Sequence, residues 1–495
     1  MRFQLNEERI IPAKTSDPNL KRISDLPDEL PAPSHNPSFT FNPQIQSLME
    51  GKALLPDEIP HSIEEIQQHY ENGCITYAKG IKTIKGKPQC SRCGNHEASL
   101  FVSFPCSRCN EQYTYCRKCI MMGRVSQCTP LIEWTGPSQN TTIETLDWTG
   151  TLSQGQQPAS DEVVKSIEAN TDLLVWAVCG AGKTEVLFNG IHQALLQGKR
   201  VCIASPRTDV ILELAPRLQK VFPAAKPIAL YGGSEDRQRY SQLIISTTHQ
   251  LYRFKSAFDV IIVDEVDAFP YSFDETLHYA VEKARKLLSS LIYLTATPDS
   301  KLQRECRHGK RNFISIPARY HRQPLPVPIL KWCGNWKSQL DKKRLATPIR
   351  MWAEKRITIN KQALIFLPTV KLMDKALPFF QQLHPDILSV HAEDPERKEK
   401  VQRMREGEVP ILLTTTILER GVTIPNIDVA VVGAEEDIFT ESALVQIAGR
   451  VGRSAEHPSG DITFFHYGKT LPMIQSIKHI KEMNREGTKR GLLDS

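Results

Sequence analysis

The sequence predicts an α/β protein in which two parallel-sheet lobes follow one another along the chain, after a small cysteine-rich module. Three features support this prediction. Short apolar runs alternate with helical patterns in two series, a proline-rich passage separates the two series, and seven cysteines are gathered between Cys90 and Cys128. Strands that are apolar throughout indicate parallel sheets covered on both faces.

Length and composition agree with a folded protein of several domains. The 495-residue chain is too long for a single core, and its hydrophobic (40%) and charged (24%) fractions are close to globular averages. The net charge of +6 suits a polyanionic partner but is also ordinary for an enzyme. The longest apolar runs have strand length, whereas a membrane span requires roughly 20 residues. We therefore expect a cytoplasmic protein without a transmembrane segment, at most peripheral to the inner face of the membrane.

The N-terminal part of the chain divides into two predicted regions. Residues 1–60 are polar and rich in proline, which leaves little periodic apolar surface, so we expect a flexible segment. A helical pattern at 63–70 leads into the cysteine cluster, and the polar stretch at 136–145 marks a boundary. These signals define a module spanning residues 61–146.

The cysteines of this module occur mostly as C-x-x-C pairs, which indicate metal binding in a chain without an export signal. Cys90-x-x-Cys93 and Cys116-x-x-Cys119 are separated by 22 residues. This spacing suits one tetrahedral Zn²⁺ held by four thiolates, and we predict this ligand set.

Two alternatives for the cysteines stay open at this point. Cys106-x-x-Cys109 is a second possible partner pair, and together with Cys128 the cluster has enough thiols for more than one metal.

Basic and tyrosine residues between the cysteines are suited to contact nucleic acid by charge and stacking, or are solvated surface. They are Arg92, Arg108, Tyr113, Tyr115, Arg117, Lys118 and Arg124.

From residue 147 onward, alternating strand and helix patterns define two lobes. The first lobe, residues 147–317, has strand patterns at 173–178, 201–205, 243–247, 260–263 and 291–294. The proline-rich passage at 316–330 is the predicted hinge. The second lobe, residues 318–495, has strand patterns at 363–367, 411–416 and 429–434.

A phosphate loop follows the first strand of the first lobe. The sequence G-x-G-K-T at 180–184 lies between a strand and a helical pattern, although alanine replaces the first glycine of the strict eight-residue motif. We expect the backbone of Gly180, Ala181 and Gly182 to wrap the phosphates of ATP. Lys183 should reach the β- and γ-phosphates, and the Thr184 hydroxyl should hold Mg²⁺.

An acidic sequence ends the fourth strand of the first lobe, where the run at 260–263 leads into D-E-V-D at 264–267. A carboxylate at the end of an apolar strand is costly unless it faces a cation, which Mg²⁺ bound to ATP supplies. We expect Asp264 to bind this metal and Glu265 to orient or deprotonate the attacking water.

With these two sites, the sequence resembles the superfamily 2 helicases, whose remaining motifs follow in order. T-A-T-P at 295–298 matches motif III, 364–369 resembles motif IV, and T-T-T-I-L-E-R-G-V-T-I-P at 414–425 resembles motif V. In the first lobe, S-P-R at 205–207 resembles motif Ia and T-T-H-Q at 247–250 resembles motif Ib. The resemblance implies two RecA-like lobes, coupling of hydrolysis to lobe movement through motif III, and contacts to the nucleic-acid strand in motifs Ia, Ib and V. The strand-contact residues that it implies are Pro206, Arg207, Thr247, Thr248 and Thr415.

Motif VI matches Q-I-A-G-R-V-G-R at 446–453. Transfer of the γ-phosphoryl group spreads negative charge, and an arginine that stabilises this charge is worth about 10³ to 10⁵ in rate. By resemblance, Arg450 and Arg453 reach across the cleft, so that hydrolysis requires both lobes to close. Other nucleotide-site residues that the resemblance implies are Gln156, as the adenine contact, and Gly421, Thr423 and Gln446. An acid usually stands where Thr423 does.

Longer phrases narrow the resemblance to one family. They include WAVCGAGKTE, VDEVDAFPYS, VHAEDPERKEKV, TTTILERGVTIP and FTESALVQIAGRVGR. Over about residues 61–485 the chain is similar to the ComFA family of late-competence DNA translocases of Gram-positive bacteria. The resemblance implies a cytoplasmic motor that draws incoming single-stranded DNA through the membrane channel ComEC during natural transformation, in association with ComFC.

We therefore predict an ATPase that moves along single-stranded DNA and uses ATP, Mg²⁺ and Zn²⁺. Its strand contacts should be mostly to phosphates, and hence independent of sequence and weakened by salt. One alternative is an RNA-directed ATPase of the same superfamily, which shares nearly every motif. The other is a nucleotide-gated clamp that binds nucleic acid without steady turnover.

Overall fold

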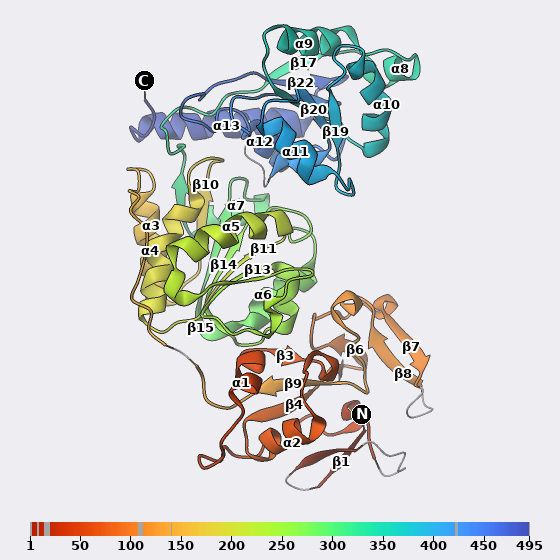
Figure 1. Cartoon of the computed structure of the whole chain (residues 1–495), viewed down its shortest axis with the longest axis vertical. Coiled ribbons are helices and arrows are strands. Elements are labelled where there is room, and N and C mark those ends of the chain that lie inside the picture. The colour runs from red at the N-terminus through yellow and green to blue at the C-terminus, as the bar shows by residue number, and fades with distance from the viewer. Residues whose placement is uncertain are drawn as a thin grey trace. The chain divides into compact units, whose positions relative to one another are not determined.

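A computed structural model of the chain describes residues 2–6, 9–13, 20–106, 112–139, 141–420 and 424–494. The described residues form two large parallel sheets with helices and, toward the N-terminus, several small antiparallel sheets (Figure 1). The chain divides into two compact units: residues 1–149, 164–172 and 189–293 in the first, and 150–163, 173–188 and 294–495 in the second. The phosphate-loop segment therefore belongs to the same unit as the C-terminal part of the chain.

The N-terminal module is built from short elements. Its helices are α1 (Pro43–Met49) and α2 (Ile63–Glu71). One sheet has the order β3-β9-β4, and three further strand pairs are β1 with β2, β5 with β6, and β7 with β8. The strands are β1 (Arg2–Leu5), β2 (Ile10–Ala13), β3 (Ala53–Leu54), β4 (Ile75–Lys79), β5 (Ile81–Ile84), β6 (Lys87–Cys90), β7 (Phe101–Pro105), β8 (Gln112–Cys116) and β9 (Pro130–Trp134).

The expectation of a flexible segment over residues 1–60 is wrong for the described part of that stretch. Phe3, Ile10 and Ile23 are fully buried and share a core with Tyr70 of α2 and with β4. The Tyr70 hydroxyl accepts a hydrogen bond from the Ile10 N–H at 3.0 Å and donates one to the Pro31 carbonyl at 2.9 Å. These apolar residues are spaced irregularly, so periodicity did not reveal that they bury one common surface.

The first large sheet has seven strands in the order β12-β13-β11-β14-β15-β10-β16. All five predicted strand patterns of the first lobe are confirmed, and β12 and β16 are additional. The strands are β10 (Leu173–Ala177), β11 (Val201–Ser205), β12 (Ile228–Leu230), β13 (Leu243–Thr247), β14 (Phe258–Asp264), β15 (Arg285–Thr295) and β16 (Asn312–Ile316). The helices in this region are α3 (Gln157–Ala169), α4 (Lys183–Leu196), α5 (Thr208–Val221), α6 (Glu275–Ala284) and α7 (Ser300–Arg307).

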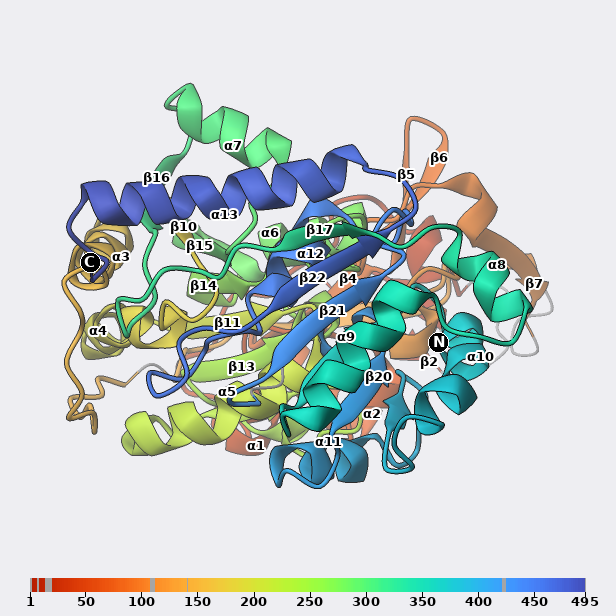
Figure 2. The ribbon, with the colours of Figure 1, turned by 90° about the horizontal axis from the view of Figure 1, so that it is seen from above.

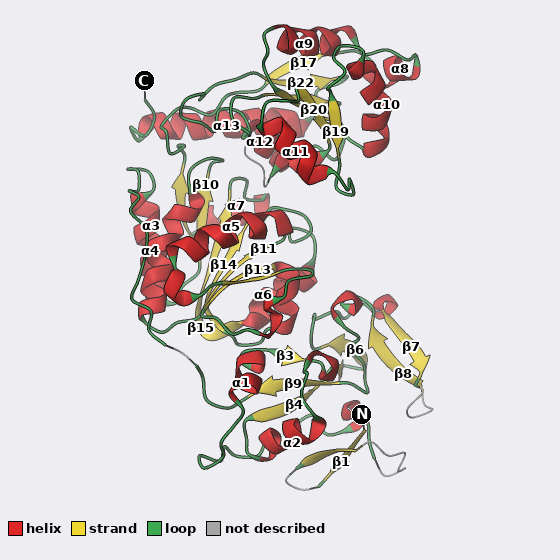
Figure 3. Cartoon of the chain, viewed as in Figure 1, coloured by secondary structure: helices red, strands yellow, loops and turns green. Residues whose placement is uncertain are grey.

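The second large sheet has six parallel strands in the order β17-β22-β21-β18-β20-β19, seen from above in Figure 2. Its strands are β17 (Ile329–Trp332), β18 (Ala363–Phe366), β19 (Leu388–Val390), β20 (Ile411–Thr414), β21 (Asp428–Val432) and β22 (Ile462–His466). Its helices are α8 (Trp336–Asp341), α9 (Thr347–Thr358), α10 (Val370–Gln381), α11 (Arg397–Arg405), α12 (Glu441–Ala448) and α13 (Leu471–Lys489). The predicted α/β class with two parallel sheets is thus confirmed (Figure 3).

A largely buried ion-pair network stabilises the region beside the hydrophobic core of the second large sheet. The Arg356 guanidinium is 3.0 Å from carboxylate oxygens of both Asp428 and Asp461 and lies over the Trp352 ring, 3.9 Å from its centroid.

Between β16 and β17, the proline-rich passage forms neither helix nor strand, as its composition predicts. Within the described residues, no helix has the combined length and apolar character of a membrane-spanning segment.

Candidate nucleotide and zinc sites

The predicted phosphate loop joins the end of β10 at Ala177 to the start of α4 at Lys183. Gly180 (φ +83°) and Gly182 (φ +72°) have left-handed backbone conformations, which glycine adopts without a steric penalty. A Cβ atom at Gly182 would lie 2.3 Å from the Gln156 Nε2 atom. The loop therefore requires glycine at this position, and its peptide N–H groups lead into the positive N-terminus of a 14-residue helix.

Gln156, the predicted adenine contact, supports this loop through its side-chain amide. The side chain is 1% exposed, and Nε2 donates to the carbonyl oxygens of Ala181 at 2.9 Å and Gly182 at 3.2 Å. Its Oε1 atom accepts a hydrogen bond from the Ser153 N–H at 2.8 Å. Both polar ends of Gln156 are thus engaged by backbone groups, and the geometry shows a brace of the phosphate loop.

The helix of motif VI lies against the phosphate loop. The Cys179 thiol donates to the Gln446 side-chain oxygen at 3.1 Å, and both residues are buried. A Cβ atom at Gly449 would lie 2.5 Å from the Cys179 Cβ atom. The glycine that follows α12 is therefore required for the close approach of these two segments, which are 267 residues apart in the sequence.

The two motif VI arginines have different environments. Arg450 is 3% exposed, and its Nε and Nη2 atoms donate to the Glu419 carbonyl at 2.9 and 2.6 Å. Arg453 donates from Nε to the Gly449 carbonyl at 3.0 Å. In this arrangement, Arg450 holds the backbone of the motif V segment, whereas Arg453 follows the turn after α12.

Motif III also reaches α12. The Thr297 N–H donates to the Thr295 hydroxyl at 2.9 Å, and the Thr297 hydroxyl lies 2.8 Å from the Ser442 hydroxyl. Arg420 donates to the same Ser442 oxygen at 3.3 Å. Motif III is thus hydrogen-bonded to the N-terminal turn of the motif VI helix.

The predicted acids lie at the end of β14, whose last residue is Asp264. The Asp264 carboxylate accepts a hydrogen bond from the Glu265 N–H at 2.9 Å. Glu265 has φ +57°, a left-handed conformation that costs a non-glycine residue about 1–2 kcal/mol. The next turn is closed by a hydrogen bond from the Ala268 N–H to the Glu265 carbonyl at 2.9 Å. Such backbone strain at the end of a buried strand is typical of functional sites.

The residues predicted to contact the nucleic-acid strand are mostly buried. Pro206 is buried, and Thr247 and Thr248 are 5% and 0% exposed. Arg207 forms an ion pair with Asp209 at 3.1 Å. Burial of both threonines argues against direct strand contacts by their side chains in this conformation, because β13 and the following turn are packed on both faces.

Three further nucleotide and strand residues were predicted in motif V. Thr415 is partly exposed and precedes the short 3-10 helix Thr416–Glu419. Gly421 and Thr423 lie outside the described residues. Their predicted contacts remain expectations from the resemblance.

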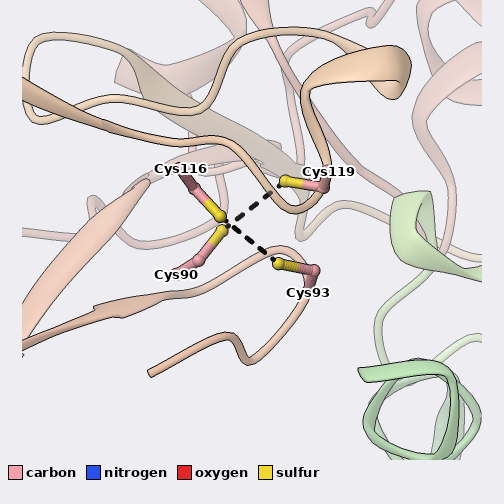
Figure 4. Close-up of side chains that lie close together, drawn as sticks. All are labelled: Cys90, Cys93, Cys116 and Cys119. Atoms are coloured by element: carbon pink, nitrogen blue, oxygen red, sulfur yellow. Dashed lines mark hydrogen bonds between the residues drawn. The ribbon is translucent and has the colours of Figure 1, made fainter. Parts of the chain in front are cut away.

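The predicted zinc ligands converge in the N-terminal module (Figure 4). Cys90 ends β6, Cys116 ends β8, and Cys93 and Cys119 follow in the adjoining turns. All four thiols are buried, and their Sγ atoms lie within 4.8 Å of one another. The Cys90–Cys119 and Cys93–Cys116 Sγ separations are 3.8 and 3.7 Å.

These separations match a tetrahedral zinc site. Four sulfur atoms at the usual Zn–S distance of about 2.3 Å occupy the corners of a tetrahedron with edges of about 3.8 Å. A disulfide would require about 2.05 Å. The cluster is therefore compatible with one Zn²⁺ held by the two outer pairs. Cys106 and Cys128 are partly exposed and do not join the cluster, and Cys109 lies outside the described residues.

A charged network that the sequence did not reveal connects the first cysteine knuckle to motif Ib. Arg92, between Cys90 and Cys93, is fully buried, and its Nη2 atom donates to both Glu58 carboxylate oxygens at 2.8 Å. The same carboxylate accepts from the Arg253 Nε atom at 2.6 Å. Burial opposes the charged form of Glu58, yet the two guanidinium groups hold its pKa below the usual range.

The 3-10 helix Thr248–Arg253 carries motif Ib, so this network fixes its C-terminal end. Arg253 also donates to the Gln250 side chain at 2.5 Å. Lys283 of α6 completes the connection, because its ammonium group donates to the carbonyls of Arg92 at 2.5 Å and Tyr252 at 2.7 Å. The first cysteine knuckle and the motif Ib turn are thus held together by hydrogen bonds and ion pairs.

The second knuckle contacts the loop that follows the predicted acids. Lys118, between Cys116 and Cys119, forms an ion pair with Asp274 at 2.9 Å. Asp274 caps the N-terminus of α6 by accepting from the Thr276 N–H. Its predecessor in the chain, Phe273, is 79% exposed.

Two exposed aromatic rings lie on this loop. Phe269 and Phe273 are 75% and 79% exposed, with ring centroids 6.4 Å apart. Between them, Tyr271 is buried and stacks on His278, 4.2 Å between centroids. The buried tyrosine anchors the loop, so the two outward rings are presented by a fixed backbone. The sequence signal for this feature is an F-x-Y-x-F alternation at 269–273, one residue after D-E-V-D.

Three family models match the chain. The N-terminal domain of competence protein ComFA matches residues 35–133, and the model described as the type III restriction enzyme res subunit matches residues 149–300. The helicase conserved C-terminal domain matches residues 348–455.

Two relatives cover most of the chain. Competence protein ComFA of Bacillus subtilis (strain 168) is 50% identical, over 91% of this chain and 97% of the relative. Competence protein ComFA of Streptococcus pneumoniae (strain ATCC BAA-255 / R6) is 39% identical, over 77% of this chain and 90% of the relative.

Solved structures share the two-lobed helicase fold. The DEAD-box helicase Mss116 bound to ssRNA and UDP-BeF superposes with a TM-score of 0.50 at 18% identity, over 70% of this chain and 84% of that one. Mycobacterium smegmatis helicase Lhr bound to ssDNA and AMP-PNP has a TM-score of 0.50 at 16% identity, over 68% of this chain and 50% of that one. At these identities the likeness concerns the fold.

Proposed function

The chain belongs to the ComFA family, and from this premise we propose that it is an ATP-driven translocase of single-stranded DNA that acts in DNA uptake during natural transformation. Its helicase domains make it a nucleotide-hydrolysing enzyme of the helicase type associated with competence. The proposal adds the strand on which it acts, the coupling of hydrolysis to movement, and the biological step.

The observation that carries the proposal is the contact between the phosphate loop and motif VI. Cys179 and Gln446 are joined by a hydrogen bond of 3.1 Å, and Gly449 permits the close approach. ATP hydrolysis that drives movement requires the phosphate-binding loop and the charge-stabilising arginines to form one site that opens and closes. A loop and a helix 267 residues apart in the sequence, already in contact, support such a site.

The residues proposed for the chemistry keep the roles expected from their types. Lys183 and the loop glycines bind phosphates, and the Thr184 hydroxyl and the Asp264 carboxylate are hard oxygen ligands suited to Mg²⁺. Glu265 is held one residue beyond the strand end, where a carboxylate can accept the proton of an attacking water. Bound Mg²⁺ supplies positive charge to the phosphates.

Motif VI supplies the remaining positive charge. We assign Arg453, in the turn after α12, to the transferred phosphoryl group, because among the described residues its guanidinium is held only through Nε, by a carbonyl of its own turn. Arg450 is assigned to the backbone of the motif V segment, which it contacts through two donors. In this proposal hydrolysis needs both arginines, Arg453 at the phosphoryl group and Arg450 through the motif V segment.

The zinc module supports strand binding rather than catalysis in this proposal. Its first knuckle holds the motif Ib turn through Arg92, Glu58 and Arg253, and its second holds the Phe269–Phe273 loop through Lys118. Exposed aromatic rings bind bases by stacking whatever their sequence. A motor that moves along a strand requires this tolerance.

We keep residues 61–146 as the zinc module and residues 147–317 and 318–495 as the two RecA-like lobes, and we propose ComFC and the ComEC channel as partners through family membership. The family matches at 35–133, 149–300 and 348–455 each overlap one of these regions, although the first begins before residue 61.

The test is steady-state ATPase activity of the full chain with single-stranded DNA, duplex DNA and RNA of equal length. We expect stimulation mainly by single-stranded DNA, decreasing as salt is raised because phosphate contacts release counterions. Stronger stimulation by RNA would show that RNA, and not DNA, is the substrate. Translocation is measured separately, by displacement of streptavidin from a biotinylated strand, and its absence in the presence of ATPase activity would contradict the motor.

A further inference from the structure

Arg319 is a buried cation at the junction of the phosphate loop and motif VI. It lies three residues after β16, in the proline-rich passage, and is 1% exposed. Its Nε atom donates to the Cys179 carbonyl at 3.3 Å, and its Nη1 atom donates to the Gly452 carbonyl. Arg319 therefore links the phosphate loop to the turn that carries Arg453.

Its neighbours in the passage make parallel contacts. The Tyr320 N–H donates to the Gly180 carbonyl at 3.2 Å, and His321 Nε2 hydrogen-bonds the Gly452 carbonyl at 3.0 Å. A Cβ atom at Gly180 would lie 3.5 Å from the Arg319 Cγ atom, so the arginine side chain lies over the glycine loop. Residues 319–321 thus touch both halves of the nucleotide site at once.

The charge of Arg319 is not balanced by an acid. Both of its hydrogen bonds go to carbonyl oxygens, and among the described residues no carboxylate forms an ion pair with it. Its Nη2 atom is buried without a hydrogen-bond partner. Burial, together with the nearby charge of Arg453, lowers the pKa of Arg319 to about 10, so the group remains charged at neutral pH.

A buried guanidinium without a counter-ion is unfavourable unless an anion completes the site. Arg319, Arg453 and the N-terminus of α4 place three sources of positive potential around one glycine loop. The matching anion is multivalent and rich in oxygen acceptors. In a site with this loop, such an anion is the phosphate chain of a nucleoside triphosphate.

We propose that Arg319 is a phosphate-binding residue of the nucleotide site, and that its Nη2 donor favours a triphosphate over a diphosphate. The inference rests on the proposed nucleotide site. Arg319 lies near Arg453 of the motif VI turn, which is assigned to the transferred phosphoryl group, so we assign the Nη2 donor of Arg319 to the same end of the phosphate chain. Because Arg319 belongs to the proline-rich passage, nucleotide binding would also act directly on the predicted hinge.

The test compares the binding of a non-hydrolysable triphosphate and of ADP to the full chain by calorimetry. Arg319→Ala should weaken triphosphate binding by about ten- to a hundredfold, the scale of a lost charge-assisted hydrogen bond, and ADP binding by much less. Arg319→Lys should restore part of the difference, since it keeps the charge and loses the planar fork. An equal loss of both affinities would show a purely structural tether and overturn the proposal.

The matched control is Arg322→Ala. Arg322 lies three residues along the same passage, is partly exposed, and forms an ion pair with Asp494 at 2.6 Å. Its replacement should leave both affinities unchanged. If wild-type protein binds neither nucleotide, the proposed nucleotide site itself fails; if it binds both and Arg319→Lys and Arg319→Ala match wild type, only the role of Arg319 fails. Thermal unfolding of the Lys variant shows whether the fold is retained.

Discussion

The Cys179 thiol donates a hydrogen bond to the Gln446 side chain at 3.1 Å, and this contact joins the phosphate loop to the motif VI helix. In the same helix, α12, the Ser442 hydroxyl lies 2.8 Å from the Thr297 hydroxyl of motif III. Three motifs recognised separately in the sequence are therefore neighbours in one contact network.

Lys183→Ala should remove ATP turnover while leaving the fold intact. The lysine is the point charge that a phosphate loop supplies to the β- and γ-phosphates, and it lies partly exposed at the start of α4. Steady-state ATPase assays and circular dichroism melting measure the two effects. Lys310→Ala, at an exposed position, is the control. Turnover retained by Lys183→Ala would mean that the phosphates bind elsewhere.

Glu265→Gln should lower the ATPase rate by about 10² or more, the usual contribution of a general base, while ATP binding persists. The amide keeps the shape of the side chain and cannot accept a proton. Comparing single-turnover rates with equilibrium binding separates the two effects. Wild-type protein that shows no steady turnover would favour the nucleotide-gated clamp over the motor.

Cys90→Ser should reduce the zinc content and loosen the N-terminal module, because a tetrahedral site loses one of four thiolates. Elemental analysis of the purified protein measures the zinc content, and limited proteolysis shows whether the N-terminal module has become more susceptible to cleavage. Cys128→Ser should retain its zinc, since Cys128 does not join the cluster. Unchanged zinc in Cys90→Ser, or its loss in Cys128→Ser, would reverse the ligand assignment.

Glu58→Gln should destabilise the chain at neutral pH, by about 1–3 kcal/mol for the lost charge-assisted bonds to Arg92 and Arg253. The folded state lowers the Glu58 pKa below its ordinary value of 4.5, so the stabilisation is present at neutral pH and is lost as pH falls through the folded-state pKa. Denaturant unfolding at neutral and acidic pH tests this. The gap between wild type and variant should narrow in acid, and a constant gap would exclude the ionic contribution.

The double replacement Phe269→Ala and Phe273→Ala should weaken single-stranded DNA binding, by about 1–3 kcal/mol for each base that stacks. Basal ATPase activity should be unchanged, because neither ring belongs to the proposed catalytic set. Fluorescence anisotropy with a labelled oligonucleotide measures the affinity. The matched control replaces Leu287 and Leu288, which are 100% and 75% exposed on β15, and should bind DNA like wild type. If both double variants bind the oligonucleotide with equal affinity, Phe269 and Phe273 do not stack on bases.

Local patterns in the sequence were sufficient for the α/β class, for eight of the thirteen strands of the two large sheets, and for the four cysteines that cluster in the N-terminal module. Apolar runs predicted strands because a strand covered on both faces is apolar throughout. The spacing of Cys90, Cys93, Cys116 and Cys119 predicted the ligand set because each C-x-x-C turn brings two thiols together. The structure gathers these four thiols and leaves Cys128 apart.

The tertiary structure decided which side chains meet across long separations. Arg253 reaches Glu58 across 195 residues, and Arg319 reaches Cys179 across 140. Thr248, which the motif resemblance implies as a contact to nucleic acid, is buried in the folded chain. Phe3 is packed into a core, although the composition of residues 1–60 predicted flexibility. Periodicity and spacing report only on neighbours within a turn or a strand. The free energy of pairing a buried charge depends on which distant group the folded chain brings beside it.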